Sequence, residues 1–157
     1  KVHGVATAAG CQLVAACDLA VAEEGTQFGT PGVRIGFFCS TPAIPLVRAV
    51  GRKRALEMLF TGRMVSAREA EQYGLINKAV PADRLDEEVR ATAEKIAEAS
   101  RLTLGIGKQA FYTQVNLSDA QAYAHGNQVM VANLFAEDAA EGLKAFLEKR
   151  KPVWKNR

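Results

Sequence analysis

The stretch Val2-His3-Gly4-Val5-Ala6-Thr7-Ala8-Ala9-Gly10-Cys11-Gln12-Leu13 decides how this chain folds. An apolar run predicts a β-strand over residues 2–6 and leads straight into small residues, after which a helix is predicted over residues 9–17. A second apolar run at residues 19–22 completes a predicted β-α-β unit. Small residues at the strand-to-helix turn let a ligand approach the backbone, and the first N–H groups of the helix can face a negatively charged oxygen such as an enolate.

Proline, glycine and capping patterns predict the elements that follow this unit. The expected elements are a helix starting at Thr41-Pro42 or Ile44-Pro45, a helix over residues 52–60 ended by Gly62, a helix from Ser66-x-x-Glu69 to Gly74, and an extended segment over residues 75–80 closed by Pro81. The front half of the chain is therefore predicted to be α/β.

The second half of the chain is predicted to be helical throughout. Four helices are expected: one capped by Asp83 and running to about Ser100, one over residues 101–115, one capped by Ser118-x-x-Gln121 and running to about Phe135, and one capped by Asp138-x-x-Glu141 and ending near Pro152. One buried stripe is expected at Leu85, Val89, Ala93 and Ile96. We place the boundary at Pro81-Ala82, between a front half that holds the site (residues 1–81) and a helical tail (residues 82–157).

Composition limits the classes of protein that this chain can belong to. The 157 residues are 48% hydrophobic and 24% charged, which is typical of a globular domain. A net charge of +3 is too small to indicate nucleic-acid binding. No apolar run reaches the roughly 18–20 residues of a membrane span. Because the chain begins at Lys1 inside an apparent strand, we expect it to be the C-terminal part of a longer protein.

Three cysteines without a Cys-x-x-Cys pair indicate neither a disulfide framework nor a metal site, and we expect them to be small buried residues. Other motifs fail on their spacing. Gly4 and Gly10 lack the third glycine of a dinucleotide fingerprint, and no Gly-x-Ser-x-Gly elbow exists. The basic clusters at residues 48–54 and 149–151 suit either an anionic small ligand or a solvated helix face.

The pattern Gly4-x-Ala6-x-x-x-Gly10-Cys11-Gln12-Leu13-x-x-x-Cys17-Asp18 resembles the core motif of the crotonase (enoyl-CoA hydratase/isomerase) superfamily. Further matches in the family's order are Gln27-Phe28-Gly29-Thr30-Pro31, Arg48-Ala49-Val50-Gly51, residues 55–62, Ala67-x-x-Ala70-x-x-x-Gly74-Leu75-Ile76, and Phe146-x-Glu148-Lys149-Arg150-Lys151. Residues 36–42 and 151–154 look most like one branch of this family. The resemblance implies the C-terminal part of a crotonase-like β-β-α superhelix, followed by an α-helical trimerisation tail.

The resemblance also implies site residues in the front half. The N–H of Ala9 aligns with the second donor of the family's oxyanion hole, which polarises a CoA thioester carbonyl, and the first donor is expected N-terminal to Lys1. Ala6, Ala8 and Gly10 are the accompanying small residues at the substrate. An alternative is that these small residues only let the helix pack closely on the strand, and both readings can hold together.

Two further positions bear on the reaction. Gln12 stands where the family's hydratases carry their first glutamate, and Gly32 where they carry the second. Neither residue can exchange a proton, so ordinary hydration is expected to be absent or very slow. Gln12 is equally consistent with a hydrogen bond to water or substrate and with a cap on nearby backbone. A change of both residues to glutamate is expected to raise hydration if the pocket is otherwise hydratase-like.

The remaining site predictions concern a loop and the tail. Cys39 is a candidate nucleophile near a helix start, against the alternative of an apolar buried cysteine, and Phe38 beside it is a candidate substrate contact. Phe146 and Lys149 match family positions that reach the CoA of a neighbouring subunit. The alternative for this pair is an ordinary amphipathic helix.

Two functions remain open from the sequence. The first is an enzyme of the lyase or isomerase kind in fatty-acid or acyl-CoA metabolism, which binds an acyl-CoA thioester and stabilises its enolate. The second is a non-catalytic acyl-CoA-binding or regulatory member of the same fold. No cofactor is expected, and coenzyme A enters as part of the substrate. The expected partner is a further copy of the chain in a homotrimer or hexamer, in the cytoplasm of a bacterium or the mitochondrial matrix of a eukaryote.

Overall fold

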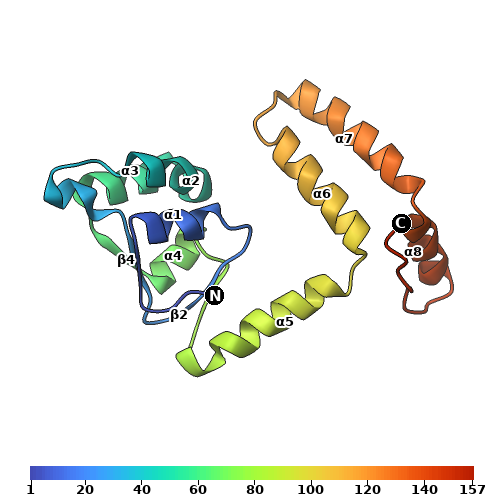
Figure 1. Ribbon diagram of the computed structural model, residues 1–157, viewed down its shortest axis with the longest axis horizontal. Coiled ribbons are helices and arrows are strands. Elements are labelled where there is room, and N and C mark those ends of the chain that lie inside the picture. The colour runs from blue at the N-terminus through green and yellow to red at the C-terminus, as the bar shows by residue number, and fades with distance from the viewer. The chain divides into compact units, whose positions relative to one another are not determined.

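A computed structural model describes residues 1–157. The chain divides into two compact units, Lys1–Thr92 and Ala93–Arg157. The first unit contains both β-sheets together with helices, whereas the second is helical (Figure 1). The predicted change from an α/β front half to a helical tail agrees with this order of elements. The boundary drawn at Pro81-Ala82 stays a prediction.

Two small sheets replace the single β-α-β unit predicted from the sequence. In the first sheet, β1 (Val5–Thr7) lies parallel to β3 (Gln27–Gly29), which pairs antiparallel with β4 (Met64–Ser66). In the second, β2 (Val21–Glu23) lies parallel to β5 (Lys78–Val80). The strand predicted over residues 2–6 is therefore wrong in extent, and Val2 forms only an isolated bridge to Ala22.

The β-α-β prediction paired the strand at residues 2–6 with the one at residues 19–22. It was wrong because the actual partner of β1 is β3, whose sequence shows no periodic pattern. β3 and β4 contain three residues each, too few for alternation to identify them. Gly29 lies opposite Met64, and a Cβ at Gly29 would lie 2.7 Å from the Met64 sulfur. Glycine at this position therefore lets the Met64 side chain pack closely on the strand, and a larger residue would displace that side chain.

The helices of the first unit begin and end close to their predicted positions. They are α1 (Ala9–Ala16), α2 (Ser40–Val50), α3 (Arg52–Thr61) and α4 (Ala67–Tyr73). The short 3-10 helix η1 (Pro31–Ile35) was not predicted. Gly62 and Gly74 end α3 and α4 in the left-handed conformation, as predicted. Pro42 lies in the first turn of α2, whereas Pro45 lies inside the helix and does not start one.

The core of the first unit lies among these helices and the three-stranded sheet. Its largest fully buried apolar side chains are Phe28, Leu46, Met58 and Val65, from β3, α2, α3 and β4. Burial of each such side chain stabilises the fold by about 1.5–3 kcal/mol. Helix α1 packs against both β1 and α2, so the start of α1 is fixed by the core beneath it.

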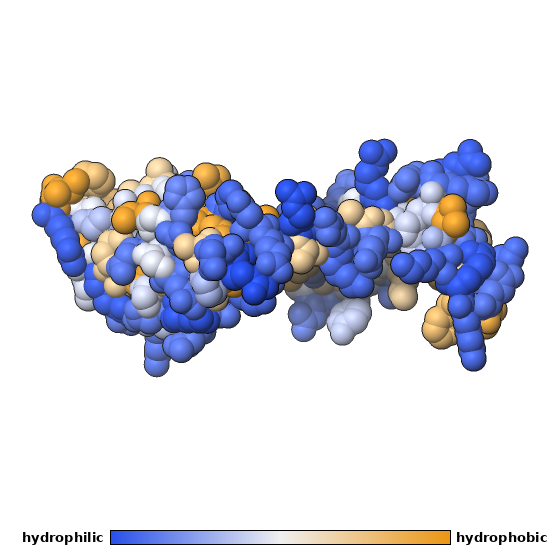
Figure 2. Space-filling model, turned by 90° about the horizontal axis from the view of Figure 1, so that it is seen from below, coloured by the Kyte–Doolittle hydropathy of each residue, from blue (hydrophilic) through white to orange (hydrophobic).

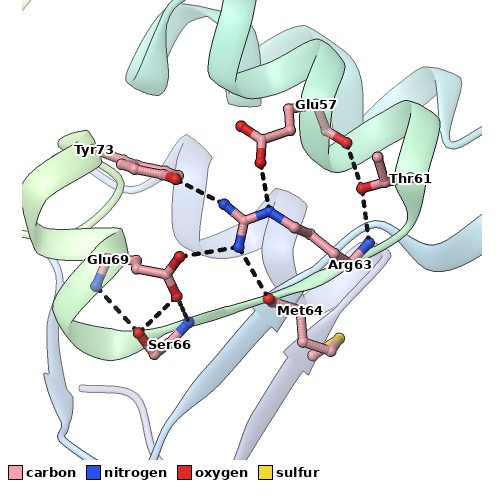
Figure 3. Close-up of polar contacts among 7 residues, drawn as sticks. All are labelled: Glu57, Thr61, Arg63, Met64, Ser66, Glu69 and Tyr73. Atoms are coloured by element: carbon pink, nitrogen blue, oxygen red, sulfur yellow. Dashed lines mark hydrogen bonds and ion pairs between the residues drawn. The ribbon is translucent and has the colours of Figure 1, made fainter.

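A polar cluster joins α3, β4 and α4 around Arg63 (Figure 3). The Arg63 guanidinium donates to Glu57 at 2.7 Å, to Glu69 at 3.0 Å and to the Tyr73 hydroxyl at 2.7 Å. Glu69 also completes the predicted capping box by accepting from the Ser66 N–H and hydroxyl. These bonds from Ser66, followed by the one from Arg63, lower the pKa of Glu69.

Helices α5 (Leu85–Ala97), α6 (Arg101–Gln114), α7 (Asp119–Leu134) and α8 (Glu137–Leu147) follow, and α5 crosses the division between the units. Asp83 does not cap α5, because it lies inside the 3-10 helix Ala82–Arg84 that precedes it. Ser118 and Gln121 do form the predicted hydrogen-bonded cap of α7. The predicted buried stripe of α5 is wrong beyond Leu85 and Val89, since Ala93 and Ile96 are exposed.

Asp138 has a different role from the predicted helix cap. Ala136 occupies the N-cap position of α8, where no side chain caps the helix. The Asp138 carboxylate, 2% exposed, accepts from the Ser100 hydroxyl at 2.5 Å and from the N–H groups of Lys155 and Asn156. Trp154 adds a hydrogen bond from its indole N–H to the Glu98 carbonyl at 2.7 Å. The carboxyl-terminal residues are therefore fastened to the start of α6 and of α8.

The second unit buries little of its apolar surface. Only Ser100, Asp138 and Ala145 are buried between residues 93 and 157, and neither α6 nor α7 has a buried residue. Large apolar side chains such as Phe135 and Phe146 are exposed, and Figure 2 shows apolar residues at the molecular surface. None of the helices has the length and apolarity that crossing a membrane would require.

Candidate active site

The carboxyl ends of β1 and β3 lie side by side at one edge of the first sheet. Thr7 is in register with Gly29, and the Ala8 N–H donates to the Gly29 carbonyl at 3.0 Å. Helix α1 leaves the sheet at this edge, as does the segment that runs through Thr30 to Gly32. Ligands of α/β proteins bind beyond the carboxyl ends of parallel strands, so this edge is the candidate site.

Ala8 holds the turn between β1 and α1 in an unusual backbone conformation. Its φ is 46° and its ψ is −112°, in a region that non-glycine residues rarely occupy. A residue held in such a region stores on the order of 1–3 kcal/mol of strain and persists only when its surroundings enforce it. The hydrogen bond to Gly29 and the packing of α1 supply that enforcement.

The strained turn leaves the first N–H of α1 available. Ala9 is exposed, and no side chain caps the helix. The N–H groups in the first turn of a helix have no partner within that helix and favour negative charge. The geometry at Ala9 therefore suits an oxygen that becomes negatively charged, which is the role that the sequence predicts for this N–H.

The other predicted site residues near this turn differ in how deeply they are buried. Ala6 is buried in the core beneath it, and Gly10 has ordinary space, since a Cβ there would lie 3.8 Å from that of Ala6. Gln12 is half-buried on the next turn of α1, and its N–H donates to the Ala8 carbonyl. A carboxamide at this place can donate and accept hydrogen bonds but cannot exchange a proton near neutral pH.

Gly32, the predicted position of the second glutamate, is buried and closely surrounded. A Cβ built at Gly32 would lie 2.7 Å from the Phe37 carbonyl oxygen and 2.8 Å from the Cys39 sulfur. The structure therefore brings together Gly32 and Cys39, which were predicted as site residues independently of each other. Cys39 is only 5% exposed, and Phe38 beside it is partly exposed with its ring against that of Phe60.

The cysteines differ in their surroundings. Cys11 is fully buried, and burial raises the pKa of its thiol to about 11, although a hydrogen bond with the Gly29 backbone opposes this. Its thiol is therefore protonated at neutral pH and is a poor nucleophile. Cys17 is exposed, so the prediction that all three cysteines are buried is wrong for this residue.

Thr30 was not a predicted site residue, yet it lies at the same edge between Gly29 and Pro31. Its hydroxyl oxygen is buried without a hydrogen-bond partner. An unpaired buried hydroxyl costs about 1–3 kcal/mol, which makes such a group noteworthy next to a candidate site. A threonine within the pattern Gly-Thr-Pro carries no signal of burial, so only the structure could single it out.

The tail residues Phe146 and Lys149 lie at the end of α8 in the second unit. Phe146 is 81% exposed, and Lys149 is exposed with a φ of 53°. The Arg150 N–H donates to the Ala145 carbonyl and the Lys149 N–H to the Phe146 carbonyl. This is the Schellman pattern, in which the position of Lys149 is usually glycine.

Some residues of the two basic clusters are engaged within the protein. Arg54 lies 4.5 Å from the centre of the Tyr73 ring and donates to the Gln72 carbonyl. Arg150 pairs with Glu141 at 2.6 Å, and this hydrogen bond is the main cause that lowers the pKa of Glu141 to about 2. These two arginines therefore have structural partners within the protein.

This fold and this site define a class of protein. The whole chain, residues 1–157, matches the family model of enoyl-CoA hydratase/isomerase, and the chain therefore belongs to that family. Its α/β structure is the crotonase fold, with mixed sheets and many helices.

Relatives place the chain more narrowly within this family. It is 55% identical to the mitochondrial enoyl-CoA hydratase domain-containing protein 3 of Rattus norvegicus over 98% of this chain and 51% of the relative. It is also 35% identical to a probable mitochondrial enoyl-CoA hydratase of Dictyostelium discoideum, over 99% of this chain and 57% of the relative. The chain spans about half the length of the curated relatives it matches.

Solved structures agree with these relatives. A crystal structure of human enoyl-CoA hydratase domain-containing protein 3 superimposes with a TM-score of 0.93 at 55% identity, covering 96% of this chain and 60% of that one. An enoyl-CoA hydratase from Mycobacterium smegmatis superimposes with a TM-score of 0.96 at 49% identity, covering 98% of this chain and 60% of that one. The resemblance read from the sequence is thus confirmed at the level of the family and of its branch.

Proposed function

We propose that the whole protein binds an acyl-CoA thioester and that the Ala9 N–H donates a hydrogen bond to the thioester carbonyl oxygen. The observation that supports this most is the turn at Ala8, whose strained backbone leaves the exposed Ala9 at the start of an uncapped helix. One such donor contributes about 3–4 kcal/mol to the stabilisation of an oxyanion. An enolate formed next to the thioester is the anion that this N–H would stabilise.

The residues on either side of this donor do not support ordinary hydration. Gln12 and Gly32 stand at the positions of two carboxylates that would add water to an enoyl-CoA, and neither can transfer a proton. General acid–base catalysis contributes roughly 100- to 10,000-fold in rate. Hydration of an enoyl-CoA by this protein is therefore slower than that of a two-glutamate hydratase by a factor of this order.

The remaining proposed contacts divide between the acyl group and CoA. Ala6, Ala8, Gly10 and Phe38 border the acyl group, whereas Phe146 and Lys149 contact the CoA bound by a neighbouring subunit. A lysine neutralises phosphate, and an exposed aromatic ring covers an apolar part of CoA. The assembly is a trimer or a hexamer, and a eukaryotic protein of this kind is placed in the mitochondrion by analogy with the names of its relatives.

A second candidate function is a non-catalytic acyl-CoA-binding or regulatory protein. The observation that favours it is the absence of space at Gly32, because a carboxylate cannot simply be supplied from that position. The two candidates share the same binding site and differ in turnover. Cys39 is the side chain beside Gly32 with nucleophilic potential, and its participation would favour the enzyme.

A titration and a rate measurement on the full-length protein test this function. Butyryl-CoA is titrated by calorimetry, and crotonyl-CoA hydration is followed by the loss of enoyl absorbance next to a two-glutamate hydratase. We expect saturable binding of butyryl-CoA and hydration that is roughly 100-fold slower or more. Hydration at a comparable rate, or no binding of either thioester, would contradict the proposal.

A further inference from the structure

The close approach to Gly32 comes from one short segment, residues 36–39. The Phe37 carbonyl oxygen and the Cys39 sulfur lie 2.7 Å and 2.8 Å from where a Cβ of Gly32 would be. Close packing leaves no free volume for an added methyl group at such distances. The nearer of the two atoms belongs to the backbone, so a rotamer change cannot move it away.

The segment is fixed at both of its ends. At its start, the Phe37 N–H donates to the Gly32 carbonyl at 3.2 Å. At its end, the Ser40 N–H donates to the Phe38 carbonyl at 2.8 Å, and the Cys39 carbonyl accepts from Ala43 in the first turn of α2. The Phe38 ring packs on Phe60 of α3. A side chain at position 32 would therefore have to displace a hydrogen-bonded and packed segment.

We propose that residues 36–39 are the specificity-determining segment of the acyl-CoA site, an inference that rests on the proposed function. This segment occupies the space in which a second carboxylate would begin, so glycine at 32 and cysteine at 39 form a coupled pair. The acyl group of a bound thioester meets a backbone carbonyl and a thiol here instead of a proton-transferring acid. The site is accordingly suited to bind a thioester without adding water to it.

The crowding around Gly32 changes the result expected when glutamates are introduced at positions 12 and 32. Gln12→Glu places an acid on a half-buried position of similar shape, but Gly32→Glu meets the Phe37 carbonyl. We therefore expect the Gln12→Glu/Gly32→Glu protein to show no gain in crotonyl-CoA hydration and a lower Tm. This expectation reverses the one drawn from the sequence, where residue 32 was considered without its neighbours.

A double-mutant cycle in the full-length protein tests the coupling. Gly32→Ala is expected to lower Tm by roughly 5 °C or more, and the same change in a Cys39→Ala background is expected to lower it clearly less, because one of two clashes is removed. Part of the decrease in Tm should remain in the Cys39→Ala background, since the contact with the Phe37 carbonyl is unchanged. Gly105→Ala is the matched control, because a Cβ there has open space, and its Tm should not fall.

Several results would overturn the inference. These are a Gly32→Ala protein as stable as the unmodified one, an equal loss of Tm with and without Cys39, or a Gln12→Glu/Gly32→Glu protein that hydrates crotonyl-CoA like a two-glutamate hydratase. Butyryl-CoA titration of the unmodified protein distinguishes a failure of the role of residues 36–39 from a failure of the proposed function. Absence of binding overturns the proposed function, whereas binding together with any of the results above overturns only the role of residues 36–39.

Discussion

Ala8 and Lys149 share a property that neither side chain explains. Both have positive φ, which among non-glycine residues of this chain is otherwise seen only at Asn156. The left-handed region costs a residue with a Cβ roughly 1–2 kcal/mol. Both positions belong to the proposed site, one beside the thioester carbonyl and one beside CoA. At Ala8 the strain supports a functional role for the turn, whereas at Lys149 the positive φ belongs to the Schellman end of α8.

Ala8→Gly is expected to stabilise the protein. Glycine adopts the φ of 46° without steric cost, so the free energy of unfolding should rise by about 1 kcal/mol, even after allowing for the greater freedom of glycine in the unfolded chain. Chemical denaturation of the full-length protein measures this change. Ala16→Gly, at the end of the same helix, is the control and should destabilise. Equal destabilisation by both variants would mean that the Ala8 backbone is not strained.

Lys149→Gly is expected to separate stability from binding. Glycine suits the Schellman position, so the free energy of unfolding should rise by about 0.5–1 kcal/mol, while loss of the ammonium group weakens CoA binding several-fold. Lys149→Asn should behave likewise, because asparagine also tolerates positive φ, whereas Lys149→Arg should keep both properties of lysine. Calorimetric titration with CoA reports the affinity. A stabilised Lys149→Gly protein with unchanged affinity would remove this residue from the CoA site.

At the scale of elements, the parts that could be predicted are those encoded by neighbouring residues. The capping box of Ser66 and Glu69 and the terminal glycines Gly62 and Gly74 were sufficient to place two helices. β3 could not be found in this way, because three residues have no periodicity and the strand forms only through its partners.

In the site, too, features encoded by neighbouring residues could be predicted, whereas contacts between residues distant in sequence could not. The turn into α1 was visible in small residues, and the family resemblance assigned roles to Ala9, Gln12 and Gly32. The crowding of Gly32 was not visible, because it depends on where residues 37 and 39 lie in space. Asp138 was interpreted as a cap for the same reason, since its partners Lys155 and Asn156 are distant in sequence.

Asp138 makes the carboxyl-terminal attachment sensitive to acid. Burial opposes its ionisation, but the hydrogen bonds from Ser100, Lys155 and Asn156 hold the pKa of Asp138 below its ordinary value. The stabilisation from a carboxylate with a lowered pKa is present above the unfolded-state pKa and is lost as the pH falls through the folded-state value. We therefore expect Tm of the full-length protein to fall as the solution is acidified below that unfolded-state pKa.

The variant Asp138→Asn tests this attachment. It should lower Tm at neutral pH and reduce the acid dependence, because its amide nitrogen cannot accept the N–H bonds that the carboxylate accepts. Asp119→Asn, at an exposed position at the start of α7, is the control. An acid profile of Asp138→Asn that matches the unmodified protein would show that this carboxylate is not the group responsible.

At the scale of the whole molecule, the exposed apolar surface of the second unit predicts a partner surface. The second unit buries three residues and exposes large ones, with Phe135 at 87%. Extended apolar surface of this kind marks an interface. In the first unit, β1 is an edge strand, because the order β1-β3-β4 leaves one side of it unpaired.

Light scattering on the full-length protein at micromolar concentration tests this requirement. We expect the mass of a trimer or a hexamer, since closed symmetric assemblies are the common solution for homo-oligomers. The isolated 157-residue chain should instead aggregate. A full-length monomer that binds acyl-CoA would refute both the assembly and the sharing of Lys149 between subunits.

Infrared difference spectroscopy tests whether the Ala9 N–H polarises a thioester carbonyl. Butyryl-CoA labelled with carbon-13 at its carbonyl is bound to the full-length protein, and the labelled C=O stretch is compared with that of the free thioester. We expect a band shifted to lower frequency, because a hydrogen bond from a preorganised N–H weakens the C=O bond. A saturated complex in which the band remains at the frequency of the free thioester would contradict it.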